Sequence, residues 1–185
     1  MRVVAGTLRG RTIASAESPG LRPTADRTRE TLFNMIASRF DLEDVRALDL
    51  YAGTGALGIE ALSRGALHCT FVERERNATR LIHQNLAALG LHDRAAVVNA
   101  DTLAWLARAS ESFGLIVADP PYALARTLPT LLDAIVANRR LAPHGLLVVE
   151  CAEAVPAPVH PALQCIADRT SGAARIALYR EQHEE

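Results

Sequence analysis

The sequence contains no lysine, and all 20 basic side chains among its 185 residues are arginines. The three cysteines, Cys69, Cys151 and Cys165, are far apart and form no CxxC pair, so we expect small core residues. The six histidines show no HxxxH spacing, and no metal site is predicted. No apolar run approaches the ~20 residues that span a membrane. The apolar stretch in residues 1–11 is too short for a secretory signal, so we expect a cytoplasmic protein without a membrane partner.

The net charge of −1 conceals an asymmetry along the chain. Residues 1–40 carry seven arginines against three acidic residues, while residues 41–185 are net acidic. A basic segment on an acidic body is a candidate for contacting phosphates, although a solvated terminal segment has the same composition. The length suits one main domain, and a monomer is expected. We therefore predict a basic N-terminal extension over 1–40 and one larger domain over 41–185.

Apolar runs and helical patterns alternate after the N-terminal segment. Strands are predicted near 46–52, 68–73, 95–99, 114–118 and 145–151, and helices near 24–39, 56–64, 75–89, 102–109 and 124–141. Such alternation predicts an α/β fold with a parallel, doubly wound sheet and right-handed crossovers. Two further strands near 163–168 and 174–179 have no long helix between them, which predicts a terminal hairpin with an antiparallel strand.

A glycine-rich loop follows the first strand of the predicted sheet. Gly53, Gly55 and Gly58 satisfy GxGxxG, and Glu73 lies about twenty residues further on, as in dinucleotide-binding folds. The pattern alone is weak, because glycine is common enough for it to occur by chance.

Asp49, four residues before the first glycine, favours one cofactor over another. A pyrophosphate in this loop would meet the Asp49 carboxylate, which is an unfavourable contact between like charges. S-adenosylmethionine (SAM) instead has an ammonium group that Asp49 can attract and a carboxylate that suits the N-terminus of the helix near Ala56. Asp101, after the third strand, is a candidate acceptor for the adenine amino group. Capping of the next helix is the alternative role of Asp49 and of Asp101.

The stretch Asp119-Pro120-Pro121-Tyr122 follows the fourth strand, at the sheet edge where open α/β folds bind ligands. The two prolines have no backbone N–H, so the loop offers hydrogen-bond acceptors in the form of a carboxylate and carbonyl oxygens. Acceptors suit a group with hydrogens to donate, such as the exocyclic amino group of a nucleobase. Tyr122 could stack on a base that is turned out of its helix. An ordinary loop turn is the alternative.

Together these motifs resemble a Rossmann-like SAM-dependent methyltransferase with a D/N-PP-Y/F motif, and more narrowly the RsmD family. The stretches MRVVAGTLRGR, LRPTADRTRETLFNMI and LDLYAGTGALGIEALSRGA carry the resemblance together with DPPY. The resemblance implies a mostly parallel seven-stranded sheet with a terminal antiparallel strand and a small N-terminal β-hairpin and helix. It also implies transfer of a methyl group from SAM to N2 of a guanine in 16S ribosomal RNA, without a metal, within an assembling small subunit.

The same resemblance assigns roles to individual residues. SAM is expected at Asp49, Gly53, Gly55, Glu73 and Asp101; the target guanine at Asp119, Pro120, Pro121 and Tyr122; and RNA at Arg22, Arg27 and Arg29. S-adenosyl-L-homocysteine is then the second product.

Three other functions remain open at this point. One is methylation of adenine N6 or of another amino group, against which Asp rather than Asn at 119 argues. Another is an NAD-dependent oxidoreductase, which Asp49 and the lack of a second nucleotide-binding half oppose. A third is a non-catalytic RNA-binding module.

Overall fold

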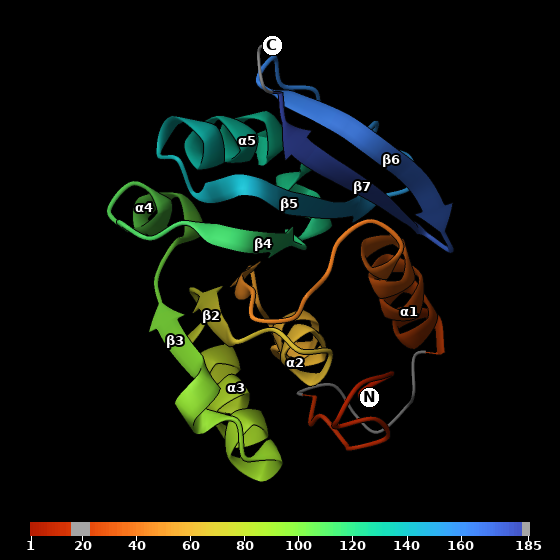
Figure 1. The fold of residues 1–185 in the computed structure, drawn as a ribbon, viewed down its shortest axis with the longest axis vertical. Helices are drawn as coiled ribbons and strands as arrows, with labels where there is room; N and C mark the ends of the chain where they lie inside the picture. The colour runs from red at the N-terminus through yellow and green to blue at the C-terminus, as the bar shows by residue number, and fades with distance from the viewer. Residues whose placement is uncertain (16–22, 183–185) are drawn as a thin grey trace.

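A computed structural model of the protein describes residues 1–15 and 23–182, and these form an α/β fold around one sheet (Figure 1). The helices are α1 (Pro23–Ala37), α2 (Ala56–Ser63), α3 (Arg76–Leu89), α4 (Thr102–Leu106) and α5 (Leu128–Ala137), with 3-10 turns η1 (His92–Arg94) and η2 (Tyr122–Thr127). The strands are β1 (Arg46–Leu50), β2 (His68–Glu73), β3 (Ala95–Asn99), β4 (Phe113–Ala118), β5 (Leu141–Ala152), β6 (Leu163–Ser171) and β7 (Ala174–Glu181). None of the helices within the described ranges is long and apolar enough to cross a membrane.

The seven strands have the order β3-β2-β1-β4-β5-β7-β6. Strands β1 to β5 are parallel, whereas β7 is antiparallel to both β5 and β6. The predicted sheet, mostly parallel and closed by a terminal hairpin, is therefore confirmed. Its order reverses between β1 and β4, and ligands of open α/β sheets bind at such a switch point, beyond the carboxyl ends of the strands.

Side chains of the central strands alternate between two hydrophobic cores, one on each face of the sheet. Ala47 and Val117 pack in the core that also contains residues of α1, α2 and α3. Leu48 and Ile116 pack in the other core, with residues of α4 and α5. Both faces of the strands are buried in this way, which explains why their sequences are continuously apolar rather than alternating.

The helix predicted over 124–141 is wrong in its bounds. Residues 122–127 form the 3-10 turn η2, α5 begins only at Leu128, and it ends at Ala137. Pro129 occupies the first turn of α5, where the missing N–H has no helical acceptor to lose. Arg139 has a positive φ of 54°, so the helix cannot continue, and β5 starts at Leu141.

The N-terminal hairpin contains a single antiparallel bridge, between Arg2 and Thr12, rather than two strands. Three backbone hydrogen bonds cross the hairpin, among them Val3 N–H to Arg11 O at 3.0 Å and Ile13 N–H to Met1 O at 2.9 Å. Beyond Val3 the backbone donates to the main body: the N–H groups of Val4 and Ala5 donate to the Glu60 carboxylate at 2.8 and 2.9 Å. These donors are no longer available for a β ladder, which accounts for the difference from the prediction.

The N-terminal segment and α1 share a hydrophobic core with the sheet. Val3, Ile13, Leu32 and Phe33 are buried in the same cluster as Ala47. The division of the chain at residue 40 stays a prediction.

Candidate active site

A cleft of about 860 Å³ opens at the carboxyl ends of β1, β2, β4 and β5. Its charged lining residues are Glu73, Arg74, Glu75, Asp101, Asp119 and Glu150. Carboxylates therefore dominate the cleft, which suits a ligand that carries positive charge or donates hydrogen bonds. Parallel strands end at one edge of the sheet, which brings several residues predicted from the sequence into the cleft lining: Gly53, Glu73, Asp101, Asp119, Pro120 and Pro121. Asp49 and Gly55 are not among the lining residues.

The glycine loop takes its shape from backbone conformation and from close packing. Gly53 and Gly55 have φ values of 55° and 79°, in the left-handed region that glycine adopts without steric cost. Gly58 is needed for a different reason. A Cβ at this position would lie 2.3 Å from Cε1 of Phe71 on β2, so a larger residue would push α2 off the sheet.

Asp49 lies beneath the glycine loop and is almost fully buried. Its Oδ2 accepts the backbone N–H of Gly58 at 2.8 Å, in the first turn of α2. Burial raises the pKa of Asp49 well above its usual range, and the nearby carboxylates of Asp119 and Glu73 raise this pKa further. The hydrogen bond is the helix contact that was the alternative role of Asp49, and attraction of an ammonium group stays a prediction.

Glu73 links the glycine loop to the start of α3. Its Oε2 accepts the N–H of Gly53 at 2.9 Å, and its Oε1 accepts the N–H of Glu75 at 2.8 Å. Each carboxylate oxygen can accept a second bond, so Glu73 retains capacity for a ribose hydroxyl.

Asp101 is exposed at the rim of the cleft. Its Oδ1 accepts the N–H of Ala104 at 3.0 Å and so caps α4. The capping role considered from the sequence is therefore present, and the carboxylate still lines the cleft. Its contact with an adenine amino group stays a prediction.

Asp119 follows the last residue of β4, and its side chain is exposed to the cleft. The surrounding protein nevertheless removes much of the water around the carboxylate, which raises its pKa to about 6. Pro120 and Pro121 line the cleft next to it. Near neutral pH, Asp119 is mostly ionised but remains close enough to its pKa to take up a proton.

Glu150 on β5 is a further candidate that the motifs did not identify. Ala118 and Val149 are paired in the β4–β5 ladder, so Asp119 and Glu150 follow directly on neighbouring strands. Burial and the charge of Asp119 together raise the pKa of Glu150 to about 8. A carboxylate at the end of the apolar run GLLVVE is the same signal that identified Asp119, applied to the next strand of the sheet.

Comparison with known proteins identifies the family of the chain. The model of the family described as Conserved hypothetical protein 95 matches residues 1–180. Ribosomal RNA small subunit methyltransferase D of Escherichia coli (strain K12) is 37% identical over 186 residues, which cover 98% of this chain and 90% of the relative. The chain belongs to the RsmD family.

Solved structures support the family assignment. The yhhF structure from Escherichia coli has a TM-score of 0.86 and 33% identity and covers 98% of both chains. SMU.776, solved in complex with SAH, has a TM-score of 0.69, covering 86% of this chain and 50% of that one. Its identity is 14%, so this second likeness shows the methyltransferase fold alone.

Two residues that the RsmD resemblance implies lie wholly or partly outside the described structure. Arg22 is outside the described residues. Tyr122 begins η2, but its side chain is outside the described part, so its stacking role stays a prediction.

The burial of Arg29 corrects one part of the predicted RNA surface. Its side chain is 4% exposed, and Nη2 donates to the carbonyl oxygen of Arg2 and, at 2.8 Å, to Asp26. Its Nε lies 3.7 Å from the buried Glu60. A guanidinium held inside the protein cannot meet an RNA phosphate, so Arg29 is a structural residue that fixes α1 to α2. Arg27, two residues earlier, is exposed.

No group of three or more potential metal ligands occurs within residues 1–15 and 23–182.

Proposed function

We propose that the protein transfers a methyl group from SAM to the exocyclic N2 of a guanine in 16S ribosomal RNA. The observation that carries this proposal is the position of Asp119, Pro120 and Pro121 in one cleft with Glu73 and Asp101. The relative's name, ribosomal RNA small subunit methyltransferase D, supports an rRNA substrate. Cytoplasmic small-subunit particles in assembly are then the natural partner.

The chemistry of the cleft fits SAM better than a dinucleotide. Its carboxylates would repel a pyrophosphate, whereas they attract the ammonium and sulfonium groups of SAM. We assign the ribose to Glu73, the adenine amino group to Asp101, and the methionine end to Asp49 and the loop of Gly53 and Gly55. When bound, SAM supplies a methyl group on a sulfonium and leaves as S-adenosyl-L-homocysteine.

Asp119 and the carbonyl oxygens of the proline pair would act on the target amine. The lone pair of a guanine N2 is delocalised into the ring, which makes it a poor nucleophile. Acceptors on the amine hydrogens favour a pyramidal nitrogen and aim the lone pair, so catalysis comes mainly from positioning and charge stabilisation. The amine must lose one proton, and Asp119, with its pKa of about 6, can accept it directly or through water.

The test is methyl transfer from labelled SAM to small-subunit particles taken from cells that lack the endogenous activity. The RNA is digested to nucleosides and analysed by mass spectrometry, with naked 16S rRNA in a parallel reaction. N2-methylguanosine is expected. N6-methyladenosine would keep the fold and cofactor but overturn the substrate, and unlabelled RNA despite SAM binding would overturn the RNA assignment.

Calorimetric titration with SAM and with NADH separates this proposal from the oxidoreductase alternative. Binding of SAM alone is expected because of the acidic cleft. Binding of NADH alone would overturn the cofactor assignment.

A further inference from the structure

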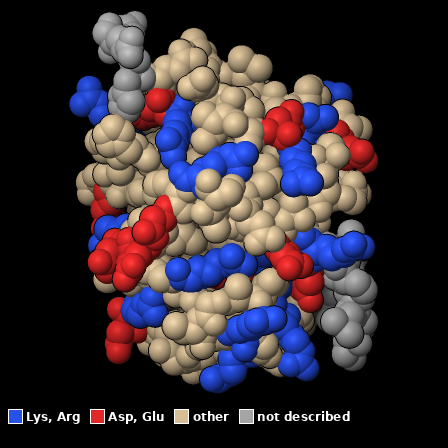
Figure 2. All heavy atoms as spheres, turned by 45° about the vertical axis from the view of Figure 1, so that its right-hand side comes forward, with Lys and Arg blue, Asp and Glu red and all other residues tan. Residues whose placement is uncertain are grey.

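A second hollow, of about 770 Å³, lies between α1 and β6, away from the acidic cleft. Its lining includes Arg27 and Arg39 of the α1 region and Arg169 of β6, together with several hydroxyl and amide side chains. Figure 2 shows arginine side chains spread over the face on which α1 and β6 come forward. We refer to this hollow as the α1–β6 groove.

The α1 wall of the groove is a polar stripe without carboxylates. Arg27, Thr31, Asn34 and Ser38 recur at intervals of four, three and four residues, which places them on one side of the helix. The acidic residues of α1, Asp26 and Glu30, do not line the groove, and Asp26 is bound to Arg29.

The charge of the groove is largely unopposed. Asp168 is its one acidic lining residue, and its carboxylate is already paired with Arg175 at 2.7 Å. Within the described residues, no carboxylate forms an ion pair with Arg27, Arg39 or Arg169. Arginines with neighbouring hydroxyl groups and without acidic partners are typical of phosphate-binding surfaces.

The sheet register relates the groove to the active-site cleft. Glu150 of β5 pairs with Ile176 of β7, and Ile176 pairs in turn with Arg169 of β6. Directly paired residues point to the same face, so Glu150 and Arg169 lie on one face, about 10 Å apart across two strand spacings. Ile176 packs in the core with α1, which identifies this face as the one that α1 covers.

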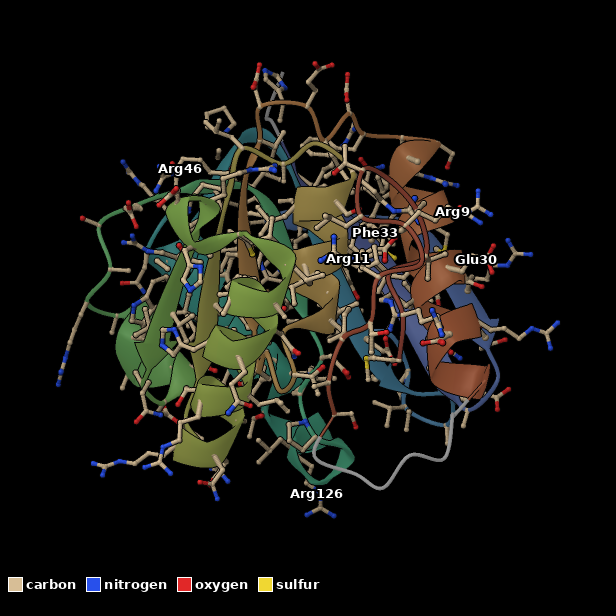
Figure 3. The ribbon with its side chains drawn as sticks, turned by 90° about the horizontal axis from the view of Figure 1, so that it is seen from below. Arg9, Arg11, Glu30, Phe33, Arg46 and Arg126 are labelled. Carbon is tan, nitrogen blue, oxygen red and sulfur yellow. The ribbon has the colours of Figure 1, made fainter. Side chains whose placement is uncertain are left out.

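The groove also reaches the sheet edge at which the cleft opens. Ser171, the last residue of β6, and Gly172, in the turn before β7, line the groove. Ala174, the first residue of β7, pairs with Ala152 at the carboxyl end of β5. Thr28 of α1 contacts the carbonyl oxygen of Ser171 at 3.4 Å. Figure 3 shows the first turn of α1 and Arg126 of η2 toward the same side of the molecule. One end of the groove therefore lies toward the edge of the sheet at which the cleft opens.

We infer that the α1–β6 groove binds backbone phosphates of the RNA strand that flanks the target nucleotide, with Arg27 and Arg169 as its main contacts. This inference rests on the proposed function for the identity of the RNA. It adds Arg169 and the β6 wall to a surface for which the sequence indicated only the N-terminal segment. It also explains how an acidic cleft can receive a polyanion: the phosphates are neutralised at a distance from it.

The test compares a double variant, Arg27→Ala with Arg169→Ala, against the wild-type protein. Arg108→Ala, an exposed arginine after α4 on the other face of the sheet, is the matched control. KM for the RNA substrate should rise about tenfold, while kcat and the affinity for SAM change less than about twofold. The dependence of log KM on log salt concentration should flatten by about 1.4, as expected for the loss of two contacts to a single strand.

Several outcomes would contradict the assignment of the groove as an RNA-binding site. If the wild type methylates rRNA but the double variant keeps the KM and salt dependence of Arg108→Ala, the groove is not an RNA site although the proposed function holds. If no rRNA is methylated, the proposed function fails, and fluorescence anisotropy with a single-stranded RNA oligonucleotide still tests the groove. Equal affinity of wild type and double variant in that assay overturns it. Thermal stabilisation by inorganic phosphate without any change in RNA affinity would likewise reject RNA as the ligand.

Discussion

The cleft at the carboxyl ends of the strands and the α1–β6 groove are similar in volume, about 860 and 770 Å³, but opposite in charge. Glu73, Asp101, Asp119 and Glu150 line the cleft, whereas arginines and hydroxyl groups line the groove. A cationic cofactor and a polyanionic substrate make incompatible demands on one surface. A chain with a net charge of only −1 can meet both demands because its acidic and basic residues line separate hollows.

Replacement of Asp119 should reduce activity more than any other change considered below. Its replacement by Ala removes the carboxylate acceptor and the nearest base, and should lower kcat by about 10³-fold. The affinity for SAM, measured by titration calorimetry, should change little. Asp119→Asn keeps one acceptor oxygen, so its kcat should lie between those of the wild type and Asp119→Ala. Near-normal turnover by Asp119→Ala would contradict catalysis at this cleft.

Replacement of Glu60 tests the buried contacts that hold α1, one wall of the groove, against the main body. The fully buried carboxylate accepts bonds from Val4, Ala5 and Arg64 and lies near Arg29. Glu60→Ala would leave these groups without their acceptor and should lower the free energy of unfolding by about 3 kcal/mol. Urea unfolding measures the loss, and Glu30→Ala, an exposed carboxylate on α1, should stay within about 0.5 kcal/mol of the wild type. Equal losses in the two variants would show that the buried network is unimportant.

The pH dependence of the reaction should reflect the ionisation of the Asp119 carboxyl. If the ionised carboxylate is required, kcat/KM should fall about tenfold per pH unit below the pKa of about 6. This fall would not reflect unfolding caused by Asp119, because a carboxyl whose pKa is raised in the folded state favours the folded state at low pH and loses that contribution as pH rises. Circular dichroism at pH 5 checks that the protein is folded. If kcat/KM does not change between pH 5 and 7, water rather than Asp119 accepts the amine proton.

Glu150→Gln should cause only a modest change in stability, and that change should depend on pH. The pKa of Glu150 is raised from 4.5 to about 8, so its contribution to stability is present below pH 4.5 and is lost as pH rises through 8. The neutral variant does not lose it. Its melting temperature should therefore rise relative to the wild type by a few degrees between pH 4.5 and pH 8.5. A difference that does not change with pH would contradict the burial of this carboxyl.

Much of the cleft could be predicted from local sequence. The glycine loop and the Asp119-Pro120-Pro121 motif follow apolar runs, and the carboxyl ends of parallel strands meet at one edge whatever the details of packing. Glu150 belongs to no named motif and was not predicted, although it ends an apolar strand sequence in the same way as Asp119. Arg29 was misassigned because an arginine in a basic segment gives no sign of burial until its partners, Asp26 and Glu60, are located in space.

The groove could not be predicted, because its walls are about 140 residues apart in the chain, as the contact between Thr28 and Ser171 illustrates. The alternation of strands and helices, the glycine loop and the acidic motif follow from the sequence alone, since hydrophobic periodicity and backbone preferences are local properties. Tertiary packing sets which arginines are buried, which carboxylates share a cleft and which basic residues of α1 and β6 line one groove. Burial and pairing of charges depend on neighbours that are distant in the chain, and packing alone brings them together.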